Sequence, residues 1–248
     1  MEASTDNDKV KCNAVRSIGN ILKILKKSHL SNLVWVDLFE KSVKALQHSL
    51  ITGNNVKVKW NTCYAFGCMM KNCYIYDDEF KSKWKDFVFP ALCSAIKSSL
   101  NFKVKINAAI SITIPDKRQN YGTYFKDIWS ILLTALEGSN HLIDFNEYKH
   151  RDNLQEQLCF SIAHLIQLMV VEDASDMENC LYPLIDITKE NWKRVLNRLL
   201  PEKSASMLAA SEKLKAWMES KNKNGERNNS IRIMSSCFQP AVDIGYSY

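Results

Sequence analysis

A row of side-chain amides recurs at a regular interval along the chain. Asn13, Asn61, Asn107 and Gln157 each stand three residues after an apolar residue that opens a similar short segment. A side-chain amide both donates and accepts hydrogen bonds, so a row of amides about 10 Å apart on adjacent helices can pair with the backbone of an extended peptide. The alternative is that each amide bonds the adjacent turn of the protein and holds neighbouring units in register.

Two further positions on the same side of each expected helix complete the candidate surface. They lie six and ten residues after the opening residue, opposite the apolar stripe described below. Together with the amides they give a candidate partner-binding set of eight residues: Asn13, Arg16, Asn20, Asn61, Tyr64, Asn107, Gln157 and His164.

Residue patterns that support catalysis or metal binding are missing from the sequence. No two of the 7 glycines lie within ten residues of each other, which excludes the dinucleotide, phosphate-loop and kinase fingerprints. The 5 histidines form no His-Glu-x-x-His pair, and the 8 scattered cysteines form no Cys-x-x-Cys pair. We therefore predict no catalytic residue, metal site or cofactor and a protein that is not an enzyme, with buried thiols typical of an intracellular compartment, cytoplasmic or nuclear.

The amides belong to an internal repeat. Segments of the form Val-Lys-x-Asn-small begin at Val10, Val58 and Val104, and a weaker copy begins at Leu154, at intervals of 48, 46 and 50 residues. Residues four, five and eight places later are mostly apolar, which predicts one helical stripe. The residues nine places later are all small, which favours close approach by a neighbouring helix, and they are Gly19, Gly67, Thr113 and Ala163.

Further amphipathic segments lie between the copies. Apolar residues keep a helical period over 33–50, 80–95 and 124–136, and 177–200 and 205–218 also have helical character. Helix starts are expected at Asp8, Asn55, Asn101 and Asp152, whose side chains can accept amide protons of the first turn. The pattern predicts an all-α fold of repeated helical pairs, none of which can bury its apolar face alone.

The first copy also carries a family resemblance. Val10 to Leu22, VKCNAVRSIGNIL, resembles the inner helix of HEAT and armadillo repeats, and Asn20 matches an asparagine that armadillo proteins use for binding. The segments 56–72, 101–122 and 128–145 are similar to the carboxy-terminal part of the HEAT repeat-containing protein 6 family, a likeness that extends over roughly 8–200. The resemblance implies a right-handed α-solenoid that acts as a scaffold without enzymatic activity.

The expected organisation has three parts. Residues 1–7 form an extension, 8–219 form a HEAT- or armadillo-like solenoid of about four helical pairs, and 220–248 form a polar, largely disordered tail. The chain opens on an inner helix, so we expect upstream repeats to be missing from it. Its first helix should then expose an apolar side.

The functional prediction is a protein-protein interaction scaffold, and the family resemblance implies that its partner binds in a concave groove lined by the inner helices of the solenoid. The alternative is an adaptor that contacts nucleic acid or chromatin through basic helix ends, since 33 Lys and Arg against 27 Asp and Glu give a net charge of +6. A pI of 8.8, below the value above 9 typical of dedicated nucleic-acid binders, argues against this alternative. The longest uncharged stretch, Leu158 to Val171, is shorter than the twenty residues of a membrane span, so no membrane partner is expected. A third possibility is that the chain is a fragment without a function of its own.

Overall fold

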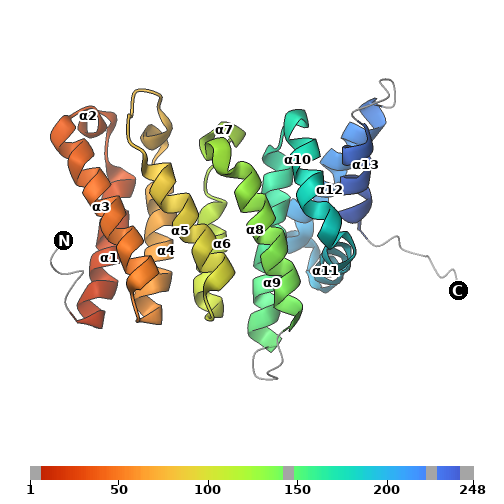
Figure 1. Ribbon diagram of the computed structural model, residues 1–248, viewed down its shortest axis with the longest axis horizontal. Coiled ribbons are helices and arrows are strands. Elements are labelled where there is room, and N and C mark those ends of the chain that lie inside the picture. Colours follow the sequence, from red (N-terminus) through yellow and green to blue (C-terminus); the bar gives the residue numbers. More distant parts are fainter. Residues whose placement is uncertain (1–6, 142–147, 222–227, 241–248) are drawn as a thin grey trace, which may run out of the picture. The chain divides into compact units, whose positions relative to one another are not determined.

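The prediction of an all-α protein is confirmed. The computed structural model describes residues 7–141, 148–221 and 228–240, and within these ranges it is helical and contains no β-strand (Figure 1). The chain divides into two compact units, residues 1–124 and 125–248.

Unit 1 contains the first three copies of the repeat. Its helices are α1 (Asp8–Ile24), α2 (Lys27–Leu30), α3 (Leu33–Thr52), α4 (Val56–Met70), η2 (Cys73–Tyr76), α5 (Trp84–Ser98), α6 (Phe102–Ile112), α7 (Arg118–Tyr121) and η3 (Gly122–Tyr124). Helices α1, α4 and α6 lie side by side with α4 in the middle, and α3 and α5 pack on them as a second layer (Figure 1). The core between the layers contains Phe39, Phe66, Trp84 and Phe89, each no more than 1% exposed.

Asparagine side chains fix where the three repeat helices begin. Asn55 and Asn101 cap α4 and α6 as predicted, each accepting bonds from the amides of the second and third helical residues. At the first helix Asn7, not Asp8, is the cap, and it accepts from the amides of Lys9 and Val10. The predicted start at Asp152 is wrong, because α9 (Tyr148–Leu168) already begins four residues earlier.

A fourth asparagine joins two neighbouring helices. Asn72, which is 4% exposed, follows α4 and donates from its side-chain amide to the carbonyl oxygens of Leu22 and Leu25, both at 2.9 Å. These carbonyls belong to the last turn and C-cap of α1, where no intrahelical partner is available. The side chain therefore holds the end of α1 against the end of α4.

We expect Asn72→Ala to lower the free energy of unfolding by about 2 kcal/mol, since it leaves two buried carbonyls without their donor. Urea unfolding followed by far-UV circular dichroism measures the loss. Asn32→Ala is the control, because Asn32 caps α3 at an exposed site and its removal should cost about 1 kcal/mol or less. Equal small losses for both variants would show that Asn72 does not hold the two helices together.

Unit 2 is less regular than unit 1. It contains α8 (Phe125–Gly138), η4 (Ser139–His141), α9, η6 (Val171–Asp173), α10 (Ala174–Leu181), η7 (Tyr182–Leu184), α11 (Ile185–Arg198), α12 (Pro201–Lys221) and α13 (Asn228–Cys237). Helix α9 packs against α8, α11 and α12, whereas α13 packs against α10, α11 and α12. The helix expected over 177–200 is interrupted by the 3-10 turn η7, which carries Pro183.

The carboxy-terminal segment differs in part from the expected disordered tail. Residues 228–237 form helix α13, and the side chains of its Ile231 and Met234, and of Phe238 directly after it, are fully buried. The Phe238 ring lies 4.9 Å from Trp192 and 5.9 Å from Trp129, between centroids, so the segment closes an aromatic cluster. Residues 222–227 and 241–248 of the expected tail, and most of the expected 1–7 extension, lie outside the described residues.

The eight cysteines are free thiols, of which Cys63, Cys68, Cys159 and Cys237 are buried and only Cys73 is exposed. Burial raises the pKa of the Cys63 thiol to about 12, so this group stays protonated at neutral pH. No described helix combines the length and the apolar character that crossing a membrane requires.

Candidate partner-binding surface

The surface is built on a close-packed seam between repeat helices. A Cβ atom added at Gly19 of α1 would lie 2.5 Å from the Cα of Ala65 in α4. One added at Gly67 of α4 would lie 2.8 Å from the Oγ of Ser111 in α6, a hydroxyl that donates to the carbonyl of Cys63 at 2.6 Å. The predicted role of the small residues is therefore confirmed at the two copies that carry glycine. The Ala65 backbone at Gly19 and the Ser111 side chain at Gly67 approach so closely that a Cβ atom has no room.

The four amides of the predicted row do not all face an open groove, because they differ in exposure. Asn13 is exposed, Asn107 is half-buried, and Asn61 is only 5% exposed because its position on α4 turns toward the neighbouring α1. The amide nitrogens of Asn61 and Asn107 donate to the carbonyls of Lys57 and Lys103, four residues earlier in their own helices, at 2.8 and 2.7 Å. Each of these amides thus bonds the adjacent turn of its own helix, and neither bond joins two neighbouring helices.

Arg16 and Tyr64, predicted from the same repeat position, meet on the surface. The guanidinium carbon of Arg16 lies 5.5 Å from the centroid of the Tyr64 ring, which is 42% exposed. A hydrogen bond with the Cys68 thiol raises the pKa of Tyr64, and Arg16 acts in the opposite direction. The phenol therefore stays neutral at physiological pH, and the pair offers a cation beside an aromatic ring.

Lysines surround this pair on the same face of the layer. Residues seven apart in a helix differ by only about 20° in direction, so three exposed residues line up along α1 and α4 and two along α6. The set, called the basic face below, consists of Lys9, Arg16 and Lys23; Lys57, Tyr64 and Lys71; and Lys103, Ile110 and the nearby Lys117.

The basic face is unbalanced in charge. Neither α4 nor α6 contains an Asp or Glu residue, and α1 contains only Asp8. Fourteen residues along a helix and two interhelical spacings give a patch of about 20 by 20 Å. The sequence analysis did not predict this face because it considered how densely the lysines occur and not how they are spaced. The spacing of the cations in multiples of seven residues can nevertheless be read from the sequence.

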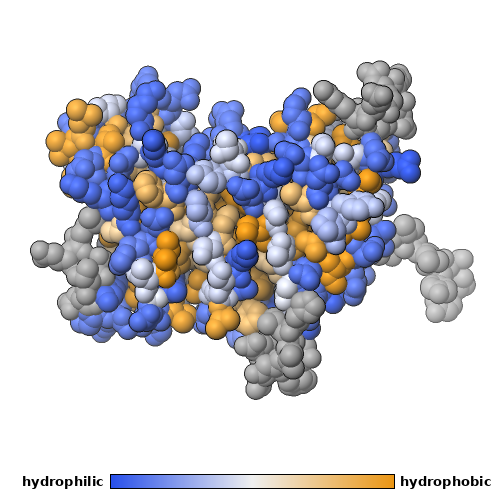
Figure 2. Space-filling view, viewed as in Figure 1, coloured by the Kyte–Doolittle hydropathy of each residue, from blue (hydrophilic) through white to orange (hydrophobic). Residues whose placement is uncertain are grey.

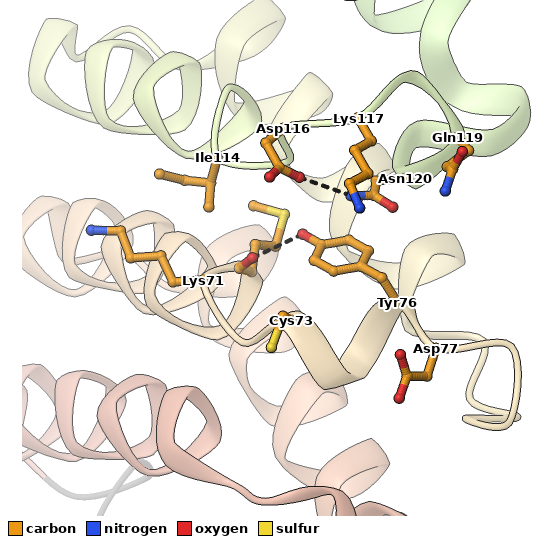
Figure 3. A pocket seen from close by; sticks show the side chains of 10 residues that line it. Lys71, Cys73, Tyr76, Asp77, Ile114, Asp116, Lys117, Gln119 and Asn120 are labelled. Atoms are coloured by element: carbon orange, nitrogen blue, oxygen red, sulfur yellow. Dashed lines mark hydrogen bonds between the residues drawn. The ribbon is translucent and has the colours of Figure 1, made fainter.

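A pocket lies beside the basic face, at the carboxyl ends of α4 and α6. Its volume is about 490 Å³, and its lining includes Lys71, Tyr76, Asp116, Lys117 and Asn120 (Figure 3). The Tyr76 hydroxyl donates to the carbonyl of Met70 at 2.9 Å, and the Asn120 amide donates to Asp116 at 3.3 Å. These bonds hold the two loops that form the walls. The pocket mixes both charges and can hold a polar side chain of a bound segment.

The remaining predicted residues are scattered. Asn20 is exposed on α1, on the same layer as the basic face. Gln157 and His164 are half-buried on α9 in unit 2, and the Gln157 amide donates to Ser161 of its own helix at 3.4 Å. The structure therefore brings together Arg16 and Tyr64 within unit 1, whereas Gln157 and His164 belong to unit 2.

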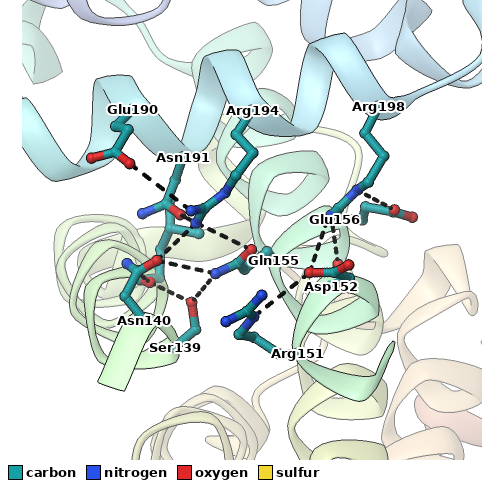
Figure 4. Close-up of polar contacts among 11 residues, drawn as sticks. Ser139, Asn140, Arg151, Asp152, Gln155, Glu156, Glu190, Asn191, Arg194 and Arg198 are labelled. Carbon is teal, nitrogen blue, oxygen red and sulfur yellow. Dashed lines mark hydrogen bonds and ion pairs between the residues drawn. The ribbon is translucent and has the colours of Figure 1, made fainter. Parts of the chain in front are cut away.

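Unit 2 instead contains a polar network that supports its packing. Gln155, fully buried, donates to Ser139 at 2.9 Å, while Arg194 of α11 donates to Asn140 at 2.8 Å (Figure 4). Arg198 of α11 pairs with Asp152 and Glu156 of α9 at 2.9 and 3.1 Å. The network joins α9 to η4 and α11, and its polar groups bond one another, as buried polar groups in a structural role do. Within the described ranges, no cluster of three or more His, Cys, Asp or Glu side chains could hold a metal ion.

Comparison with known proteins gives little guidance on function. No family model matches the chain, and no solved structure matches it. The chain is similar to a putative uncharacterized protein of Dictyostelium discoideum, with 32% identity in an alignment 169 residues long that covers 63% of this chain and 11% of that protein. The chain thus matches about a tenth of the length of this relative, whose name states no activity.

Proposed function

We propose that the chain is a non-enzymatic binding module, a right-handed solenoid of HEAT-type helical pairs that binds a protein partner through the basic face. The repeat period, the recurring small residues and the side-by-side packing of α1, α4 and α6 support the HEAT-type assignment. We propose that the chain is related to the HEAT repeat-containing protein 6 family.

The basic face is the observation that carries this function. Lysines near both ends of α1 and α4, together with Lys103 of α6 and Lys117 beyond its end, flank the Arg16–Tyr64 pair and Ile110. Cations thus border an aromatic and an apolar contact point. Cations at the rim attract an acidic partner, and the exposed ring and isoleucine select its side chains. The partner proposed is an extended acidic segment of another protein that crosses the three helices.

The test is a binding titration of the full chain with a fluorescent acidic peptide. A peptide of about fifteen residues made of glutamate and serine suffices, since an extended chain spans about 3.3 Å per residue. We expect saturable binding whose affinity falls as salt screens the lysines. The Tyr64→Ala variant should bind the peptide more weakly than the unchanged protein at the same salt concentration. A lysine-serine peptide of the same length is the control. No binding of the acidic peptide, or equal binding of both peptides, would contradict the proposal.

Nucleic acid is a second candidate because the lysines stand at helix ends in two rows. Single-stranded DNA of similar charge distinguishes the two partners in competition with the acidic peptide. If DNA displaces the peptide at lower concentration, and its affinity falls steeply and linearly with the logarithm of the salt concentration, the phosphate backbone is the preferred ligand. The proposal expects the peptide to compete better, because Tyr64 and Ile110 add contacts that phosphates do not use.

A further inference from the structure

The side of α1 that faces away from α4 is exposed, and its carboxy-terminal half is apolar. Asn13, Ser17, Ile21 and Ile24 follow one another along this side, called the α1 flank below. Ile21 is 53% exposed and Ile24 is 72% exposed. This bears out the expectation that the first helix exposes an apolar side.

The next repeat shows what such a flank is built to do. Residues 61, 65, 69 and 72 occupy the same positions in the repeat as the α1 flank, 48 residues later. In α4, Ala65 and Met69 are fully buried, and Asn72 directly after the helix donates a hydrogen bond to the end of α1. Burial at these positions comes from α1, which packs alongside α4.

A specific pairing of small residues lies at the centre of each seam. Gly19, nine places after the opening residue of α1, meets Ala65, seven places after that of α4. Gly67 and Ser111 repeat the same pairing between α4 and α6. Ser17 is the residue seven places after Val10, so it stands where the glycine of a preceding helix would fit, and it is exposed.

The amino-terminal part of α3 is also apolar and exposed. Leu33, Val34 and Leu38 are 86%, 67% and 47% exposed, and hydrophobic residues gather at the α2–α3 end of unit 1 (Figure 2). In the next pair, Phe80 is 8% exposed and packs edge-on against Phe39 of α3, with ring centroids 5.0 Å apart. The outer helix α3 thus presents an apolar contact to the pair that follows it.

We propose that the α1 flank and the start of α3 form a docking interface for another helical pair of this same repeat type. The occupant is a helix parallel to α1 that presents glycine or another small residue to Ser17, with its companion helix covering Val34 and Leu38. A second copy of this chain fits less well, because two α1 flanks facing each other bring together two serines without a glycine. Such a pair would also bring Lys9 and Lys23 of the two copies close together.

The test supplies such a pair within the full chain. A duplicate of residues 7–54 is inserted directly before Asn7, so that the added outer helix enters α1 through an asparagine cap as α3 enters α4 through Asn55. We expect amide exchange in the original α1 to slow by about tenfold or more, because the added pair covers its flank. Binding of a dye specific for exposed apolar surface should fall in parallel.

Two matched variants keep the result interpretable. Gly19→Leu in the added copy alone, and Ser17→Leu in the original α1 of the duplicated protein, should each abolish the extra protection. Ser17→Leu in the unmodified chain should change nothing, because that position is exposed. Unchanged exchange in α1, or protection that survives both leucines, would overturn the proposal. So would dimerisation of the unmodified chain that Ser17→Leu abolishes, since the occupant would then be a second copy.

Discussion

Gly19→Leu is expected to destabilise unit 1 by about 3 kcal/mol or more, the upper part of the range for overpacked sites. Even a Cβ atom at this position would lie 2.5 Å from the Cα and 2.9 Å from the carbonyl oxygen of Ala65. Because the obstruction is backbone, no rotamer of a neighbour can relieve it, and α1 must move away from α4. Helix propensity alone predicts the opposite sign, since leucine favours a helix over glycine by nearly 1 kcal/mol.

Urea unfolding, combined with hydrogen exchange of the α1 and α4 amides, measures this loss and places it in unit 1. Ser17→Leu is the control, because it introduces the same side chain two residues away on the exposed flank. It should change stability by no more than about 0.5 kcal/mol. Similar effects of the two leucines would mean that α1 and α4 do not meet at Gly19.

The second large effect concerns binding. Lys57→Glu combined with Lys71→Glu should weaken binding of the acidic peptide by on the order of tenfold or more, because two attractive contacts become repulsive. Both residues are exposed and border Tyr64 along α4, so the change alters the centre of the basic face without touching the core. Anisotropy titrations at two salt concentrations measure the affinity.

Lys81→Glu combined with Lys97→Glu is the control for total charge. Lys97 lies in the last turn of α5 in the other layer and Lys81 precedes that helix, and both are exposed. The two double variants have the same net charge, so only position distinguishes them. If the control variant weakened binding of the acidic peptide to the same extent, binding would depend on the overall charge of the protein and not on the basic face.

Much of the fold of unit 1 could be predicted because it depends on local rules that repeat. The apolar stripe marks the side of each helix that faces the second layer, and the glycines mark where backbones approach. Asn55 and Asn101 identify helix starts by their side-chain chemistry. The repetition of these signals in register made each one stronger than it would be alone.

The candidate site was predicted only in part, for a geometric reason. Position three in the repeat lies at the border between the open face and the flank toward the preceding helix. A neighbour therefore covers Asn61, whereas Asn13 stays exposed. Position six lies nearer the middle of the open face, where Arg16 and Tyr64 meet.

Long-range contacts explain what the sequence could not predict in unit 2. Asp152 resembles a helix cap but pairs with Arg198, 46 residues later in the chain. Helix α13 follows a polar stretch that suggested disorder. Phe238, directly after this helix, nevertheless packs against both Trp129 and Trp192. Neither partner can be identified from local composition, because burial depends on residues distant in sequence.

The most direct test of the account maps where the acidic peptide binds. Backbone amide shifts of the labelled full chain are followed while the peptide is added. The account predicts that the largest changes cluster at Arg16, Tyr64 and Ile110 and at the lysines of the basic face, on α1, α4 and α6 together. Changes confined to α3 and α5, or to unit 2, would contradict it.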